Sequence, residues 1–117
     1  MKYMLLLFDN GDWNADETSE EAFAAEMEAH NAFAAWCGEQ GIAILGSEAL
    51  HGGSSATTVR RGEGDAWLVT DGPAVEVKEN LGGYYILDCR DLDQAIEAAK
   101  HCPIGTANEV RPVWEFE

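Results

Sequence analysis

Two segments of this chain are apolar at every position, and they constrain most strongly what it can fold into. Residues 3–8 are Tyr-Met-Leu-Leu-Leu-Phe, bounded by the polar run Asp9–Gly11, and residues 84–87 are Tyr-Tyr-Ile-Leu. A strand with one face in water alternates apolar and polar side chains, because successive side chains point to opposite faces. Neither segment alternates, so both are predicted strands whose two faces need cover.

Two helices are predicted between the strands. The first has candidate caps over residues 16–19, carries the acidic residues Glu20 and Glu21 at its N-terminus, and continues to about Glu39 before Gly41 ends it. The second runs from the capping residue Asp91 to His101. Inward positions of the first helix recur at spacings of three and four. They are Phe23, Met27, His30, Ala34 and Cys37.

Further strands are predicted at residues 42–45, 83–89 and 108–116. Between the first and second strands of this set, residues 57–60 and 66–70 flank a Gly-rich turn at 62–65 and predict a β-hairpin. Residues 71–81 are predicted to form a polar loop. Cys89 closes the strand that contains Tyr84 and Tyr85.

The order β-α-β, hairpin, β-α-β predicts an α+β fold: a ferredoxin-like sandwich with an inserted β-hairpin, built as one domain over residues 1–117. The last strand fits a sheet edge, because Pro112 lacks the N–H group that a central strand needs. Its even positions are apolar and its odd positions are mostly polar, as on a strand with one wet face.

A second copy of the chain is the predicted partner. Two helices cover only one side of a four-stranded sheet, yet the strands at 3–8 and 84–87 are apolar on both faces. Two sheets packed face to face across a two-fold axis would cover the remaining face. We therefore expect a homodimer or a larger even assembly.

Net charge restricts the other partners. The chain carries a formal charge of -15, which disfavours nucleic acid and anionic membrane surfaces because both would repel it. The acidity fits either a soluble surface or attraction of a cationic ligand. No run reaches the roughly 18 apolar residues of a membrane span, and the apolar start is too short for a signal peptide and lacks a cleavage site. We expect no membrane association and a cytoplasmic protein.

Cysteines and histidines give no metal or disulfide pattern. The three cysteines, Cys37, Cys89 and Cys102, are odd in number and lack C-x-x-C spacing. The histidines are scattered, so no metal site is predicted. Cys37 and Cys89 lie in apolar surroundings and are expected in the core.

An ordered series of motifs resembles the YCII-related family, in the branch named for a D-G-P-F motif. The segments that carry the resemblance are Lys2–Leu6, Ala56–Arg60, Asp71–Tyr85 and Glu109–Val113. The resemblance implies a dimeric α+β barrel, and some relatives occur beside or fused to alternative sigma factors. This chain departs from the motif at Ala74, where the branch has Phe, so the ring at that position is missing or replaced from elsewhere.

His30 and Asp71 are the candidate catalytic residues. His30 lies on the inward face of the first helix, eleven residues before Gly41, the spacing at which the broader family places a histidine proposed to act with an aspartate. Asp71 opens a turn that Gly72 and Pro73 make rigid. A carboxylate beside His30 would orient its ring and favour its charged form. The alternatives are a core histidine and an aspartate that bonds only its own turn.

Four further residues are candidates for substrate binding. Glu76 and Lys78 lie in a segment of alternating charge that lines the cleft mouth in the family, and Arg111 can clamp a carboxylate or phosphate. Tyr84 and Tyr85 point to opposite faces, and Tyr85 is taken as the one that lines the cleft. Each has a plain alternative, which for Arg111 is an ion pair with Glu109 or Glu76.

Two classes of function fit these residues. The first is a small enzyme without a cofactor, using a His–Asp acid/base pair on a small anionic organic substrate. The second is a non-catalytic ligand-binding or regulatory module associated with sigma-factor systems. No nucleotide fingerprint, phosphate loop or nucleophile elbow is present in the sequence. A solvent-reachable His30 would favour the enzyme, and an enclosed one the module.

Overall fold

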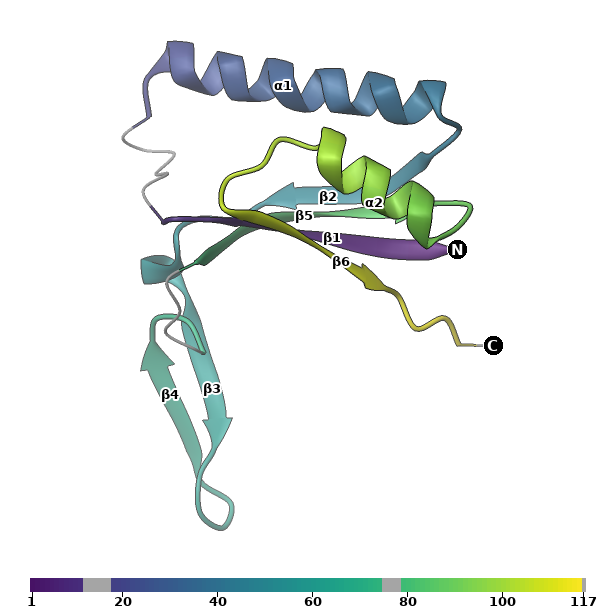
Figure 1. Cartoon of the computed structure of the whole chain (residues 1–117). Coiled ribbons are helices and arrows are strands. Elements are labelled where there is room, and N and C mark those ends of the chain that lie inside the picture. The colour runs from purple at the N-terminus through teal and green to yellow at the C-terminus, as the bar shows by residue number, and fades with distance from the viewer. Residues whose placement is uncertain (12–17, 75–78, 117) are drawn as a thin grey trace.

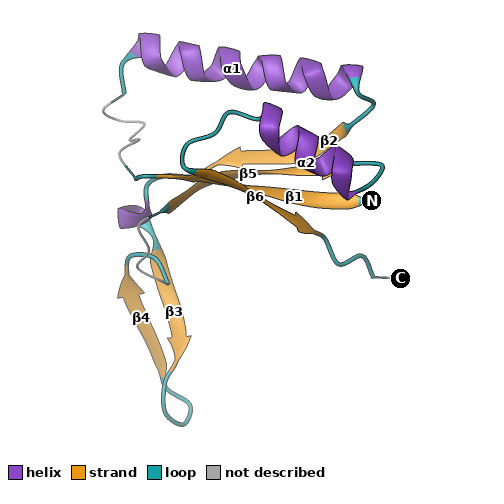
Figure 2. Ribbon diagram, in the orientation of Figure 1, coloured by secondary structure: helices purple, strands orange, loops and turns teal. Residues whose placement is uncertain are grey.

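An antiparallel sheet carries two helices on one of its faces (Figures 1 and 2). The structure is a computed structural model that describes residues 1–11, 18–74 and 79–116. Within these residues the elements of this layered body are β1 (Lys2–Asp9), α1 (Glu20–Glu39), β2 (Ala43–Ala49), β5 (Asn80–Asp88), α2 (Leu92–His101) and β6 (Ala107–Pro112). None of the described helices is long and apolar enough to cross a membrane.

The strand order is that of the predicted fold class. Among the described residues the body forms a four-stranded sheet in the order β2-β5-β1-β6. Two β-α-β units that interleave in this way make a ferredoxin-like α+β sandwich, so the predicted fold is confirmed. β6 lies at an edge, as Pro112 predicted.

The core fills the space between the sheet and the two helices. Leu5 of β1 lies opposite Tyr85 of β5, and Tyr3 lies opposite Leu87. All four are buried, together with Phe33 of α1. The three cysteines are buried here as free thiols, so the expected core positions of Cys37 and Cys89 are confirmed.

The second face of the sheet has no helix over it (Figure 1). Met4 and Leu6 alternate with the buried positions of β1 and therefore point to this face. Their partners across the strands are Ile86 and Tyr84 on β5, and Arg111 and Glu109 on β6. This open face has an apolar middle, as the two unalternating segments predicted.

Helix α1 is packed along only half of its length. Ser19 caps it, its Oγ accepting a hydrogen bond from the N–H of Ala22 at 3.1 Å. In the C-terminal half Phe33 and Cys37 are buried, but in the N-terminal half Phe23 is 52% exposed and Met27 is 45% exposed. Of the predicted inward positions, His30 is therefore partly covered and Cys37 is buried, whereas the prediction is wrong for Phe23, Met27 and Ala34, which are exposed.

A glycine in β5 contributes to this gap. Gly83 is the helix-facing position that precedes Tyr85, and a Cβ there would stand 2.8 Å from the carbonyl oxygen of Glu48 in β2. The close approach of β2 excludes a side chain at this position. No side chain of β5 is therefore available there to fill the space toward the first turns of α1.

Several strand ends differ from the predicted ones: β5 begins at Asn80 inside the predicted loop 71–81, and the largest differences are at the ends of β2 and β6. β2 continues to Ala49, since Ser47 and Glu48 pair with Tyr85 and Tyr84 after a register shift near Gly46. The last strand ends at Pro112, because its partner β1 begins at Lys2 and offers one further acceptor, the Lys2 carbonyl, to the N–H of Val113. Pairing, rather than alternation of side chains, sets both ends.

The inserted hairpin forms a separate two-stranded sheet, β3 (Thr57–Arg61) with β4 (Trp67–Asp71). A short 3-10 turn at Gly53–Ser55 precedes it. Figure 1 shows this arm projecting from the body on the side of the open face. Gly72, with φ of 98°, turns the chain directly after β4, as its place before Pro73 predicted.

Two substitutions on α1 test how this helix is packed. Phe33→Ala should lower the free energy of unfolding by about 3–5 kcal/mol, because it empties a fully packed site. Phe23→Ala, the same change ten residues earlier, should cost no more than about 0.5 kcal/mol because that ring is half exposed. Urea denaturation followed by circular dichroism would measure both. Equal losses would show that the N-terminal half of α1 is packed as tightly as the rest.

Candidate functional site

His30 lies between a carboxylate and a phenol. Its Nδ1 is 2.6 Å from the hydroxyl oxygen of Tyr85, and its Nε2 is 3.0 Å from Oε1 of Glu26. Glu26 precedes His30 by one helical turn on α1, so the two side chains are neighbours on the helix surface. Tyr85 rises from β5 beneath the helix. The described structure thus joins a helix and the sheet through one imidazole.

The chemistry of the three groups fixes where the protons lie when the imidazole is neutral. An ionised Glu26 can only accept a hydrogen bond, so Nε2 of His30 must carry the hydrogen. Nδ1 is then an acceptor, and the hydroxyl group of Tyr85 donates to it. The result is a continuous chain of hydrogen bonds from phenol to imidazole to carboxylate.

Tyr85 is held in its neutral form. Burial, together with the smaller effects of the nearby Cys102, Cys37 and Glu26, raises the pKa of its hydroxyl group to about 12. Phe33 packs edge-on against the Tyr85 ring, with 5.0 Å between ring centroids. Tyr85 is therefore a rigid proton donor or hydrogen-bond partner rather than a phenolate base.

Solvent reaches the site from the side of Glu26. The side chain of Glu26 is 47% exposed and that of His30 is 24% exposed, whereas Tyr85 is buried. Met27 and Phe23 lie on the same helix face as His30, on its open side, and both are half exposed. An incoming molecule would meet an apolar helix surface with the imidazole at its inner end.

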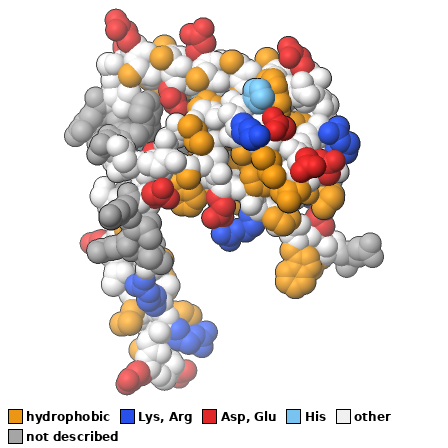
Figure 3. All heavy atoms as spheres, in the orientation of Figure 1, with side chains coloured by type: hydrophobic (Ala, Val, Ile, Leu, Met, Phe, Trp, Pro, Cys, Tyr) orange, Lys and Arg blue, Asp and Glu red, His pale blue; other side chains and the backbone are white. Residues whose placement is uncertain are grey.

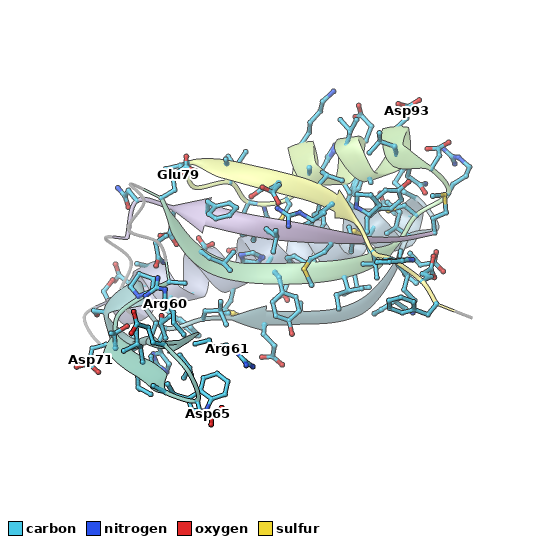
Figure 4. The ribbon with its side chains drawn as sticks, turned by 90° about the horizontal axis from the view of Figure 1, so that it is seen from below. Arg60, Arg61, Asp65, Asp71, Glu79 and Asp93 are labelled. Carbon is cyan, nitrogen blue, oxygen red and sulfur yellow. The ribbon has the colours of Figure 1, made fainter. Side chains whose placement is uncertain are left out.

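The expected partnership of His30 with Asp71 is corrected. Asp71 ends β4 of the arm, where it lies opposite Thr57 in a sheet separate from the one beneath His30 (Figure 4). No hydrogen bond joins the two residues in the described structure, and the carboxylate beside His30 is that of Glu26. The arm takes Asp71 away because its strands pair only with each other.

Arg111 is also separated from His30. It lies opposite Met4 and so projects from the open face, on the side of the sheet away from Tyr85. There it forms an ion pair with Glu109 at 2.6 Å, with 67% of its own side chain exposed. The structure therefore has the alternative named for Arg111 in the sequence analysis, an ion pair with Glu109. Glu76 and Lys78 lie outside the described residues, whereas Tyr85 is in contact with His30.

A hollow in the described residues lies elsewhere, between the C-terminal end of α1 and α2. It measures about 330 Å³ and is lined by Trp36, Gln40, Arg90, Asp93, Gln94, Glu97 and His101. It is open to solvent, and the buried amide of Gln94 already bonds the carbonyl of Gln40 and the N–H of Arg90. We therefore place the candidate site at His30, where the titratable groups converge.

Comparison with known proteins decides the family. A family model described as the YCII-related domain matches residues 1–117 of the chain. The chain belongs to the YCII-related family. It is also 39% identical over 64 residues to an uncharacterized protein of Rhizobium meliloti (strain 1021), a match that covers 51% of each chain. This YCII-related chain therefore spans about half the length of the curated relative that it matches.

Sequence reasoning missed Glu26 in this YCII-related domain. The signal was present, since Glu26 and His30 are four residues apart on a predicted helix, a spacing that places their side chains together. Glu26 was overlooked because the helix carries several glutamates and only its apolar positions were used.

In the D-G-P-A turn, the carbonyl of Ala74 accepts a hydrogen bond from the guanidinium of Arg60 on β3. The turn that follows β4 is therefore joined to β3 of the arm by this hydrogen bond.

Removing the Tyr85 hydroxyl tests the bond to His30. Tyr85→Phe should lower the free energy of unfolding by about 1–2 kcal/mol, because Nδ1 of His30 loses its partner in a largely buried place. Tyr84→Phe, on the open face, is the matched control and should cost less than about 0.5 kcal/mol. Chemical denaturation would measure both, and equal effects would contradict the assigned contact.

Removing the Arg111 side chain tests its assignment to a surface ion pair. Arg111→Ala should change the free energy of unfolding by at most about 1 kcal/mol, since exposed pairs contribute little. The His30 imidazole should keep its NMR signals, because Arg111 lies across the sheet from it. A change in the chemical shifts of the His30 imidazole in this variant would show instead that Arg111 contacts the candidate site.

Proposed function

We propose that this YCII-related domain is a small acid/base enzyme that works without a cofactor and uses His30 as its proton carrier. The observation that supports this most directly is the imidazole held between Glu26 and Tyr85, with its outer edge still exposed. Histidine is the side chain best suited to give and take a proton near neutral pH. Glu26 takes the orienting role that the sequence assigned to Asp71.

Tyr85 can anchor His30 in both of its protonation states, because its hydroxyl group can both donate and accept a hydrogen bond. When Nδ1 is bare, the hydroxyl donates to it, and when Nδ1 carries a hydrogen, the hydroxyl oxygen accepts from it. The ring of His30 therefore stays anchored in either protonation state. Proton exchange with a substrate then takes place at Nε2, once the exposed Glu26 side chain gives way or shares that nitrogen.

The substrate that fits is compact and partly apolar. The half-exposed Phe23 and Met27 would contact its apolar part, and His30 would meet a carbon acid or hydroxyl group at its other end. Arg111 cannot bind the anionic group expected on the substrate, because it projects from the opposite face of the sheet. An anion would have to be held by residues other than Arg111.

The alternative function, a ligand-binding or regulatory module, would use the same surface without proton transfer. The 24% exposure of the His30 side chain favours the enzyme, since an enclosed imidazole would have no access to a substrate. A link to sigma-factor systems rests on the family resemblance alone. The experiment below separates the two functions.

Deuterium exchange offers a test of proton transfer before a substrate is known. In D₂O the protein should speed the exchange of hydrogens beside the carbonyl of at least one member of a panel of small ketones and keto acids, followed by ¹H NMR. His30→Gln should lower that rate by about 10²-fold or more, the usual contribution of a positioned acid or base. Arg111→Ala should keep the full rate. If the wild-type protein is no faster than His30→Gln on any compound, while the compounds still shift the Met27 methyl signal, the site binds without catalysis.

A further inference from the structure

Helices α1 and α2 pass each other in opposite directions, and two contacts join them (Figure 1). In the first turn of α2, Nε2 of Gln94 donates a hydrogen bond to the carbonyl of Gln40, the C-cap of α1, at 3.1 Å. In the last turn of α2, the ring of His101 stacks on that of Trp36 with 4.0 Å between ring centroids. All four residues line the hollow of about 330 Å³ between the helices, so a contact bounds it toward each end of α2.

The wall of this hollow at the Gln94 end is held by buried hydrogen bonds. Gln94 is 8% exposed, and its Oε1 accepts a hydrogen bond from the N–H of Arg90 at 2.7 Å while its Nε2 bonds to Gln40. Asp91, the N-cap of α2, accepts from the N–H of Gln94 at 2.9 Å. A buried amide with partners at both ends holds one position. This end of the hollow therefore keeps its shape without a ligand.

Two charged side chains at this end are available to a ligand. The guanidinium of Arg90 is held only through Nε, which lies 3.4 Å from Oδ2 of Asp91, and 72% of the side chain is exposed. Its terminal nitrogens have no partner in the part of the chain that the structure describes. The carboxylate of Asp93, which Figure 4 shows on α2 away from the other labelled residues, likewise joins no hydrogen bond or ion pair of the described residues. One cation and one anion therefore line the hollow without pairing with each other.

The other carboxylate of the hollow already has a cation beside it. Oε1 of Glu97 is 3.0 Å from Nζ of Lys100, and the carbonyl of Glu97 accepts a hydrogen bond from Nδ1 of His101 at 3.0 Å. Glu97 lies one helical turn after Asp93 and one before His101, so the three side chains share one side of α2. Figure 3 shows acidic, basic and histidine side chains gathered beside hydrophobic ones on the surface over α2. The hollow thus offers unpaired charges of both signs beside the indole of Trp36.

We propose that this hollow binds a free α-amino acid with an apolar side chain. The guanidinium of Arg90 binds its carboxylate, since arginine suits a carboxylate in geometry as well as in charge. Asp93 binds its ammonium group. The apolar side chain extends from the Gln94 end toward Trp36, whose indole supplies a large apolar surface. A volume of about 330 Å³ lies within the usual range for small-molecule sites, about 300–1,000 Å³.

The arrangement of charges selects an α-amino acid over ligands that carry one sign of charge. A simple cation would meet Arg90 at the same end, and a simple anion would meet Asp93 and the field of a chain with net charge -15. A zwitterion carries no net charge, so this field does not repel it. An α-amino acid also carries both charges on one carbon, which suits two residues three positions apart around the start of α2.

The hollow is separate from the His30 site. Trp36 follows His30 by six residues on α1, which turns the two side chains to different sides of the helix. Glu26 and Tyr85, the partners of His30, do not line the hollow. Binding of an amino acid here therefore does not rest on the proposed proton transfer, and either can fail without the other.

Titration with related small molecules tests the ligand class. L-Phenylalanine should shift the indole N–H signal of Trp36 in ¹H–¹⁵N spectra, identified by its loss in Trp36→Phe, and the shift should saturate below about 10 mM. Phenethylamine and 3-phenylpropionate keep the ring, but each lacks one of the two charges. They should bind at least about tenfold more weakly, because each leaves one charged contact unmade. No saturable shift with L-phenylalanine or L-leucine, or equal binding of either analogue, would overturn the proposal.

Matched variants locate the bound molecule. Arg90→Gln and Asp93→Asn each remove one charge at an exposed position, so the fold should be kept. Each should raise the dissociation constant of L-phenylalanine at least about tenfold. Arg111→Gln, which removes a cation on the other side of the sheet, should leave that constant unchanged. Far-UV circular dichroism checks that α2 is intact in each variant. Wild-type dissociation constants in all three variants would contradict the proposal, because the molecule would then bind elsewhere.

Discussion

The pairing of β1 with β5 holds the rest of the structure in place. Leu5 and Leu87 have no solvent exposure, and the register that sets Leu5 opposite Tyr85 also sets Tyr3 opposite Leu87. A shift of one residue would turn these side chains to the open face and leave α1 and α2 without a surface to pack on. It would also carry Tyr85 away from His30. The core and the candidate site therefore depend on one register.

Local signals in the sequence were sufficient for the elements and their order. Asp91 caps the second helix as predicted, and Ser19, within the predicted cap range 16–19, caps the first, since a cap depends only on neighbouring residues. The alternation of Tyr84 and Tyr85 correctly left one ring in the core. Strand ends were predicted less well, because the length of β2 and β6 depends on where the partner strand begins and ends.

The candidate site was predicted only in part, for a physical reason. His30 and Tyr85 follow from helix and strand periodicity, which fixes the face to which a side chain points. Asp71 was expected nearby because a rigid turn mounts it well, but rigidity says nothing about where the turn lies. The hairpin carries Asp71 into a second sheet, and no periodicity in the sequence encodes that displacement. Glu109, two residues before Arg111 on the same strand face, was the better guide to the surroundings of that arginine.

Helix α1 is anchored at one end and loosely covered at the other, and His30 lies at the boundary. Such a helix opens from its uncovered end, so amide hydrogens in its first two turns should exchange with solvent much faster than those beyond His30. A molecule that settles against Phe23 and Met27 would supply the missing packing and slow that exchange. Slower amide exchange in the first turns of α1 would then report that the site is occupied, whatever chemistry follows at the imidazole.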